Sequence, residues 1–182
     1  MDFKNFKDQG QKLGVGSSDY FKLEQGENRC RILTEAEPSI THFIGKGTKP
    51  APCGPSPCQY CAKGLKHTVR VMLYLLDRKD ETIKLAELPW TVYKALGELA
   101  NSSEYGFAKL PPYDLTIIRT GEGMDTSYSV MPGRNETPVP KKILDELATK
   151  KPVLEIIAAR KEQPMGVTEV PLPTEYSVDL PF

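Results

Sequence analysis

The chain has 182 residues, and its 24 basic and 24 acidic side chains give a formal net charge of zero. This length is enough to bury a core without disulfides, and it predicts one domain with short appendages. A neutral chain excludes a histone-like nucleic-acid surface, so any binding of nucleic acid must depend on a local groove.

Composition also bears on where the protein works. No apolar run is long enough to cross a membrane, and residues 1–7 are polar and charged, unlike a secretory signal. We therefore expect a soluble, cytoplasmic protein with no membrane partner. Residues 161–182 hold one basic and four acidic side chains, which leaves a charge of +3 on residues 1–160.

The N-terminal part of the chain is predicted to begin with a flexible arm. Residues 1–18 form this arm, because they end in the glycine- and serine-rich stretch 14–18. Two short strands follow at residues 20–23 and 28–33, joined by a turn at residues 25–27.

A histidine and three cysteines stand close together after these strands. Cys53, Cys58 and Cys61 follow His42, and the last two cysteines form a CxxC pair in a segment rich in proline and glycine. Thiolates and a neutral imidazole are good ligands of Zn²⁺, and four protein ligands make a closed, structural site. Grouped cysteines in a reducing compartment point to metal, and this loop has few other means of staying ordered. The sequence therefore predicts Zn²⁺ on these four side chains.

Two alternatives stay open at this cluster. His67 lies six residues after Cys61 and could replace His42 as the fourth ligand. We prefer His42, because the apolar segment 40–44 could carry it on a strand. The cysteines could instead be free thiols or a CxxC redox pair. Cys30 lies outside the cluster and is predicted to be a core residue.

The strongest strand signal lies at residues 68–77, where one alternating face is apolar and the other includes Arg70 and Tyr74. Residues 82–87 return as a partner strand. A helix is predicted at residues 90–100, with an apolar face and with a proline available for its first turn.

Further elements complete the predicted fold. A second hairpin is expected at residues 113–120 and 126–131, and helices at residues 141–149 and 153–160. Many strands without a βαβ repeat favour a mainly β fold, a closed β-barrel such as the OB-fold. An α+β domain centred on a zinc ribbon is the alternative.

The predicted organisation has four parts. The flexible arm is followed by an OB-fold core at residues 19–135, into which a zinc loop at residues 42–67 is inserted. A helical segment at residues 136–160 follows. Residues 161–182 are proline-rich, acidic and without periodicity, and they predict a disordered tail.

A groove that binds single-stranded nucleic acid combines cations for the backbone with aromatic faces for the bases. The predicted strands and their connections offer both, and the interleaving of the two kinds favours such a groove. The candidate cations are Arg29, Arg31, Lys46, Arg70, Lys84 and Arg119. The candidate stacking residues are Tyr74, Tyr93, Tyr105, Phe107, Tyr113 and Tyr128.

An enzymatic interpretation fits less well. Residues 57–61 match the PCxxC half of a nucleobase-deaminase signature, but the other half requires a glutamate two residues after the histidine. Here His42 is followed by Phe43 and Ile44. The thiolate of Cys53 would also fill the position where water must bind. We therefore expect no enzymatic activity.

The order His, Cys, Cys, Cys followed by a strand-rich region resembles the zinc-containing single-stranded DNA-binding proteins of T-even phages. Residues 113–117 and 121–128 also look like a stretch that recurs in related phage proteins. The resemblance covers roughly residues 19–135. It implies an OB-fold that coats single-stranded DNA, with zinc held by the same four side chains.

The last four residues are Asp179, Leu180, Pro181 and Phe182. They resemble the acidic C-terminal tip of bacterial single-stranded DNA-binding proteins. That resemblance implies a tip that binds host or phage replication and repair enzymes. The expected function is thus to coat and protect single-stranded DNA in phage replication, recombination and repair. A zinc-containing protein adaptor that binds no nucleic acid is the alternative.

Overall fold

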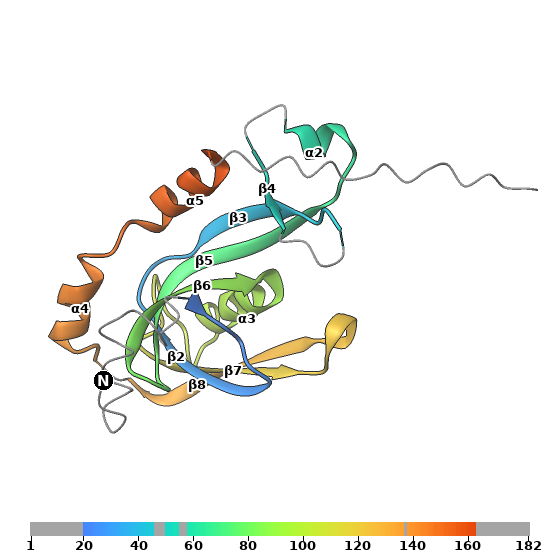
Figure 1. Cartoon of the computed structure of the whole chain (residues 1–182). Coiled ribbons are helices and arrows are strands. Elements are labelled where there is room, and N and C mark those ends of the chain that lie inside the picture. Colours follow the sequence, from blue (N-terminus) through green and yellow to red (C-terminus); the bar gives the residue numbers. More distant parts are fainter. Residues whose placement is uncertain (1–19, 46–49, 55–57, 137, 163–182) are drawn as a thin grey trace, which may run out of the picture.

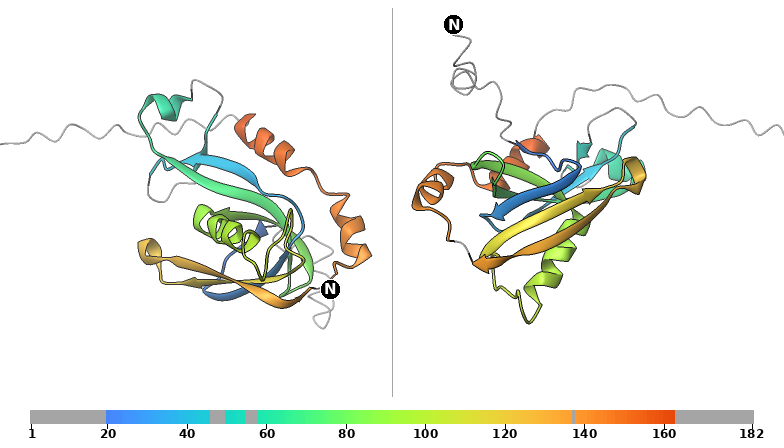
Figure 2. Two further views of the ribbon diagram at one scale, coloured as in Figure 1. Left: turned by 180° about the vertical axis from the view of Figure 1, so that it is seen from behind. Right: turned by 90° about the horizontal axis from the view of Figure 1, so that it is seen from below.

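The structure is a computed structural model, and it describes residues 20–45, 50–54, 58–136 and 138–162. The strands are β1 (Tyr20–Phe21), β2 (Gly26–Ile32), β3 (Glu37–His42), β4 (Ala51–Pro52), β5 (His67–Asp77), β6 (Thr82–Pro89), β7 (Tyr113–Thr120) and β8 (Ser127–Glu136). The helices in these ranges are α2 (Gln59–Ala62), α3 (Trp90–Ala100), α4 (Lys141–Leu147) and α5 (Val153–Glu162), with a 3₁₀ turn at Gly123–Asp125. Figures 1 and 2 show α3 inside the curve of the sheet, with α4 and α5 along its outside.

The strands form one mixed, open sheet. Its path runs β1-β6-β5-β2-β7-β8, and β3 pairs with β5 and with β4. Only β1 and β6 pair in parallel among the described strands. In the same ranges the two ends of the path, β1 and β8, do not pair with each other. The prediction of a mainly β fold is confirmed, and the described sheet shows no closed barrel.

Strand β5 joins two parts of the molecule. Along one edge its first half pairs with β3, from Met72 back to His67, and its last residues pair with β2. Along the other edge β6 accompanies it from Arg70 to Asp77. The start of β5 therefore extends beyond β6 and carries a projecting unit made of β3, β4, α2 and the start of β5, here called the metal arm (Figure 1).

Alternation along β5 sends its side chains into two separate cores. The core on the α3 side includes Val71, Leu73, Leu75, Val92 and Leu96. The core under α4 and α5 includes Met72, Tyr74, Leu76, Ile143, Val153 and Ile157. Burying each large apolar side chain stabilises the fold by about 1.5–3 kcal/mol. The side chains on both faces of β5 are therefore buried from Val71 onward.

Most predicted elements form near the expected residues. The helix at residues 90–100 and the strand at residues 113–120 have the predicted bounds. Strand β8 continues past residue 131 to Glu136. It includes Pro132, which is tolerated because β8 is an edge strand. Helix α5 extends to Glu162, two residues into the predicted tail.

Some predictions fall outside the described residues. These are the N-terminal arm at residues 1–18, the tail from residue 163 and Lys46. Among the helices that the structure describes, none combines the length and the apolar character needed to cross a membrane.

Candidate metal centre and nucleic-acid groove

Four predicted ligands come together in the metal arm. His42 ends β3, Cys53 follows β4, and Cys58 and Cys61 lie at the start and within α2. Their donor atoms all lie within 4.8 Å of one another. His42 Nε2 is 3.6 Å from Cys58 Sγ and 3.5 Å from Cys61 Sγ, and the sulfurs of Cys53 and Cys61 are 3.7 Å apart.

These separations are those of the edges of a tetrahedral zinc site. With Zn–S bonds of about 2.3 Å and Zn–N bonds of about 2.0–2.1 Å, two bound sulfurs lie about 3.8 Å apart and a bound nitrogen and sulfur about 3.6 Å. The three measured separations match these values. The cluster therefore fits a metal ion, with a donor set that Zn²⁺ prefers.

His42 is oriented for this role by the backbone. Its Nδ1 lies 3.1 Å from the carbonyl oxygen of Leu65. A carbonyl only accepts, so Nδ1 carries the proton and Nε2 keeps a lone pair directed at the sulfurs. The side chain is also fully buried, whereas His67 is exposed. Burial and orientation both favour His42 as the fourth ligand.

The local backbone prepares Cys58 to bind a cation. Cys58 precedes the short helix α2, and amide groups near its sulfur, first that of Cys61 and then that of Tyr60, lower the pKa of the Cys58 thiol to about 6. Desolvation and the neighbouring thiols raise the pKa of Cys53 to about 11. Neighbouring thiolates repel one another, and a divalent cation bound between the sulfurs would offset this repulsion.

The described cysteines form no disulfide. All four are free, including the CxxC pair of Cys58 and Cys61, and the sulfurs of Cys53 and Cys61 are 3.7 Å apart, far longer than a disulfide bond of about 2.05 Å. Cys30 is fully buried, and burial is the first cause that raises the pKa of its thiol to about 12. Cys30 is thus an inert core residue.

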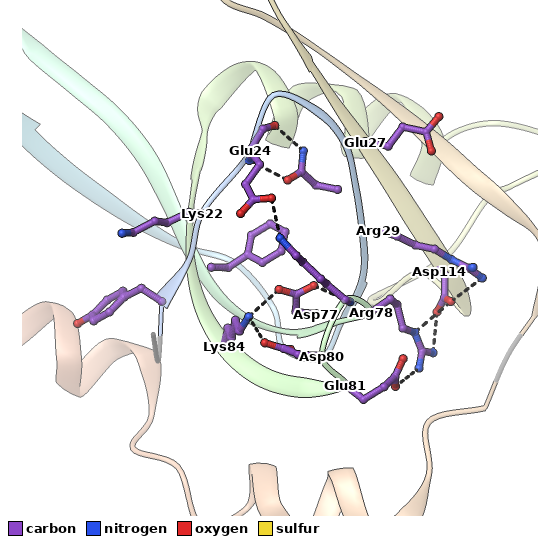
Figure 3. Close-up of a pocket in the computed structure, with 14 residues that line it drawn as sticks. Lys22, Glu24, Glu27, Arg29, Asp77, Arg78, Asp80, Glu81, Lys84 and Asp114 are labelled. Atoms are coloured by element: carbon purple, nitrogen blue, oxygen red, sulfur yellow. Dashed lines mark hydrogen bonds and ion pairs between the residues drawn. The ribbon is translucent and has the colours of Figure 1, made fainter. Parts of the chain in front are cut away.

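A cavity of about 930 Å³ is lined mainly by charged side chains, most of which pair with one another (Figure 3). Asp114 accepts two bonds from Arg78, at 2.8 and 3.1 Å, and its carboxylate lies 3.3 Å from Arg29. On another wall, Lys84 pairs with Asp77 at 2.7 Å. Here called the charged cavity, this region is held together by its own ion pairs.

A second hollow, of about 560 Å³, has a different lining and is here called the aromatic groove. Trp90 and Tyr93 of α3 lie on it, are 50% and 38% exposed, and have ring centroids 5.2 Å apart. Phe107, Lys94 and Lys109 also line it. Within the described residues neither lysine forms an ion pair. The groove thus combines open aromatic faces with cations that remain available.

The apolar surface of the groove side continues onto the metal arm. Ile40 and Val69 are paired across β3 and β5 and are 38% and 37% exposed. Alternation places Val69 on the same face of β5 as Leu73, which lines the groove. The same alternation places Arg70 on the opposite face with Met72.

The predicted DNA-contacting residues are separated by the fold. Tyr93 and Phe107 line the aromatic groove, whereas Arg29 and Lys84 line the charged cavity. Lys46 lies outside the described residues. The predicted DNA contacts are thus divided between the aromatic groove and the charged cavity.

Several other candidates are used inside the fold. Tyr74 is buried, and its hydroxyl donates to the carbonyl of Lys151. Three more candidates donate hydrogen bonds to backbone carbonyls. Tyr113 donates to Tyr105, Arg31 to Pro112 and Arg119 to Leu23. Tyr128 is half-buried against the core on the α3 side. In this conformation Tyr74 and Tyr113 have no open face for a base.

The aromatic and basic residues of the groove that were not among the predicted contacts are Trp90, Lys94 and Lys109. A signal for the first two exists in the sequence. Trp90, Tyr93 and Lys94 are spaced i, i+3, i+4, which brings them onto one side of a helix. Lys109 lies in an irregular connection whose position no periodicity predicts.

Comparisons with models of known protein families, with curated proteins and with solved structures found no match. The structure by itself defines a mainly β protein with a Cys₃His cluster that can hold a metal ion.

Proposed function

We propose that this protein binds and coats single-stranded DNA without catalysing a reaction. The observation that carries the proposal is the aromatic groove, where Trp90 and Tyr93 lie beside Lys94 and Lys109. Bases of any sequence stack on aromatic faces, and ammonium groups attract the phosphates. The resemblance of the metal cluster and hairpin to phage single-stranded DNA-binding proteins points to the same function.

Zn²⁺ is the proposed ion in the metal arm, held by His42, Cys53, Cys58 and Cys61. When bound, it supplies a structural crosslink between β3, β4 and α2. Four protein ligands leave no open position for a substrate, which agrees with a role in stability rather than in catalysis. Because β5 joins this arm to the sheet, the crosslink also supports one side of the groove.

The wider context is part of the same proposal. An OB-fold is itself a partly open barrel, so we retain that fold class for the curved sheet. The protein would act in phage replication, recombination and repair in the cytoplasm of a bacterial host. Its tip, Asp179, Leu180, Pro181 and Phe182, would recruit host or phage enzymes, and it lies outside the described residues.

Trp90 provides a direct test, because it is the only tryptophan of the chain. Titration with oligo(dT) should quench its emission, and a rise in salt concentration should weaken that binding steeply. A dye-labelled oligonucleotide gives an independent measure of the same affinity. If neither signal changes at micromolar protein and low salt, the chain does not bind single-stranded DNA.

The metal has a separate test. Protein purified under reducing conditions should contain about one zinc, and removing it with a chelator should lower the melting temperature, since ligand binding to the folded state stabilises it. Leu154→Ala, an exposed change on α5, should keep the metal, whereas Cys58→Ala should lose it. A metal-free but stable protein would refute the zinc assignment.

One observation favours the adaptor as a second candidate. Phe43 and Leu65 on the metal arm are 61% and 36% exposed, and exposed apolar residues can dock a protein partner. An adaptor of this kind would give no signal in either oligonucleotide titration.

A further inference from the structure

A fifth donor atom lies against the metal cluster. His67 pairs with His42 across β3 and β5, and the two imidazole centroids are 4.7 Å apart. His67 Nε2 is 3.2 Å from Cys61 Sγ and 3.8 Å from Cys53 Sγ. The arm therefore presents five donors, whereas a structural zinc site almost always uses four.

The distances indicate which donors compete. A nitrogen and a sulfur that occupy two corners of one zinc tetrahedron lie about 3.6 Å apart. The separation of His67 and Cys53 is compatible with such an edge. His67 and Cys61 are closer than that, so they lie beside the same corner of the tetrahedron rather than at two corners.

Burial divides the five donors in the same way. His42 and Cys58 are buried and form the inner side of the cluster, and Cys53 is half-buried. Cys61 and His67 are both exposed. Of the three thiols in the cluster, that of Cys61 is thus the most open to reagents in solution, and the spare imidazole lies next to it.

We propose that His67 is a reserve ligand, which takes the coordination position of Cys61 when that thiolate is lost. The resulting set of His42, Cys53, Cys58 and His67 is a Cys₂His₂ set, which Zn²⁺ also accepts in structural sites. This inference rests on the proposed metal site and adds that the site retains its ion after the loss of one thiolate.

Co²⁺ is a suitable probe, because its absorption reports both tetrahedral geometry and the number of bound thiolates. Cys61→Ala should still bind Co²⁺ with tetrahedral d–d bands, and its thiolate charge-transfer band should fall by about one third, as two sulfurs remain of three. The double variant Cys61→Ala/His67→Ala should bind about 100-fold more weakly than Cys61→Ala, since only three ligands remain. His67→Ala alone should weaken binding by about tenfold, the lower end of the range for a residue that only contacts a ligand.

Each outcome of this series is decisive. Equal affinities for Cys61→Ala and the double variant would overturn the reserve role, and so would a Cys61→Ala protein that binds no Co²⁺. If His67→Ala alone loses the ion as His42→Ala does, His67 is an ordinary ligand and the inference also fails. If the unsubstituted chain binds no Co²⁺, the metal site itself is absent, which is a different failure.

A second measurement avoids any variant at Cys61 that does not fold. The zinc-loaded chain is treated with iodoacetamide, whose iodide leaves as the Cys61 sulfur is alkylated, and native mass spectrometry then counts the zinc. The singly alkylated chain should retain zinc, and singly alkylated His67→Ala should release it. Release from both proteins would contradict the inference.

Discussion

The two hollows of this protein differ in how their polar groups are satisfied. The charged cavity is the larger, about 930 Å³ against about 560 Å³, but its basic groups at Arg78 and Lys84 already hold carboxylates. The aromatic groove has fewer charges, yet Lys94 and Lys109 are available and the rings of α3 are open. Volume alone would select the charged cavity rather than the groove that we propose as the binding site. A ligand gains most where it satisfies groups that the fold has left available.

The largest expected effect tests the charged cavity as a structural element. Asp114→Ala removes a buried carboxylate that faces Arg31 and Arg78, which are themselves largely buried. Removing the buried carboxylate that these two cations share should lower the free energy of unfolding by about 3–5 kcal/mol, measured by urea denaturation. The exposed control Asp145→Ala should change it by less than about 0.5 kcal/mol. A stable Asp114→Ala protein with weakened DNA binding would reverse the comparison of the two hollows.

The next effect concerns the stacking surface. Trp90→Ala should weaken binding of a dye-labelled oligo(dT) by about 1–3 kcal/mol, because one stacking partner is lost, and Trp90→Phe should recover part of this. Leu154→Ala is a control of similar exposure on α5, at 60%. Equal losses for Trp90→Ala and Leu154→Ala would show that the aromatic groove is not the site.

The lysines should act on the salt dependence. Lys94→Ala and Lys109→Ala should each reduce the slope of log affinity against log salt by about 0.7, since each removes one phosphate contact from a single strand. Lys141→Ala removes an exposed lysine from α4 and serves as the charge-matched control. An unchanged slope in both groove variants, with intact folding, would place the phosphates elsewhere.

The smallest effect is expected at Arg29, a predicted DNA contact whose side chain is 69% exposed and pairs with Asp114. Arg29→Ala should alter the free energy of unfolding by about 0–1 kcal/mol and leave DNA affinity and its salt slope unchanged. A slope reduced as much as in Lys94→Ala would extend the binding surface into the charged cavity.

Local patterns predicted the elements and the metal cluster well. The spacing of Cys53, Cys58 and Cys61 in a proline-rich segment carries its own chemistry, and helix α3 has both an apolar periodicity and a proline before it. Such signals are contained within a short stretch of chain, so they can be recognised without knowledge of the fold.

The proposed binding surface could not be predicted in the same way. Alternation along β5 correctly separated Tyr74 from Leu73, but it does not say what covers each face. Helices α4 and α5 return from about 70 residues away and bury Tyr74, as the bond from its hydroxyl to Lys151 shows. Likewise, the charge of Arg31 is visible in the sequence, but its contacts with Asp114 and Pro112 depend on long-range pairing.

The continuity of β5 has a mechanical consequence. This single strand of 11 residues, without glycine or proline, extends over about 35 Å from the metal arm into the centre of the sheet. A continuous strand without these residues has few positions at which the backbone bends easily, which favours a fixed geometry between the arm and the groove. A rigid receptor loses little conformational entropy on binding and leaves the adjustment to its ligand. For the proposed function, such a geometry would favour a flexible single strand over a DNA duplex, which resists bending because its persistence length is about 50 nm.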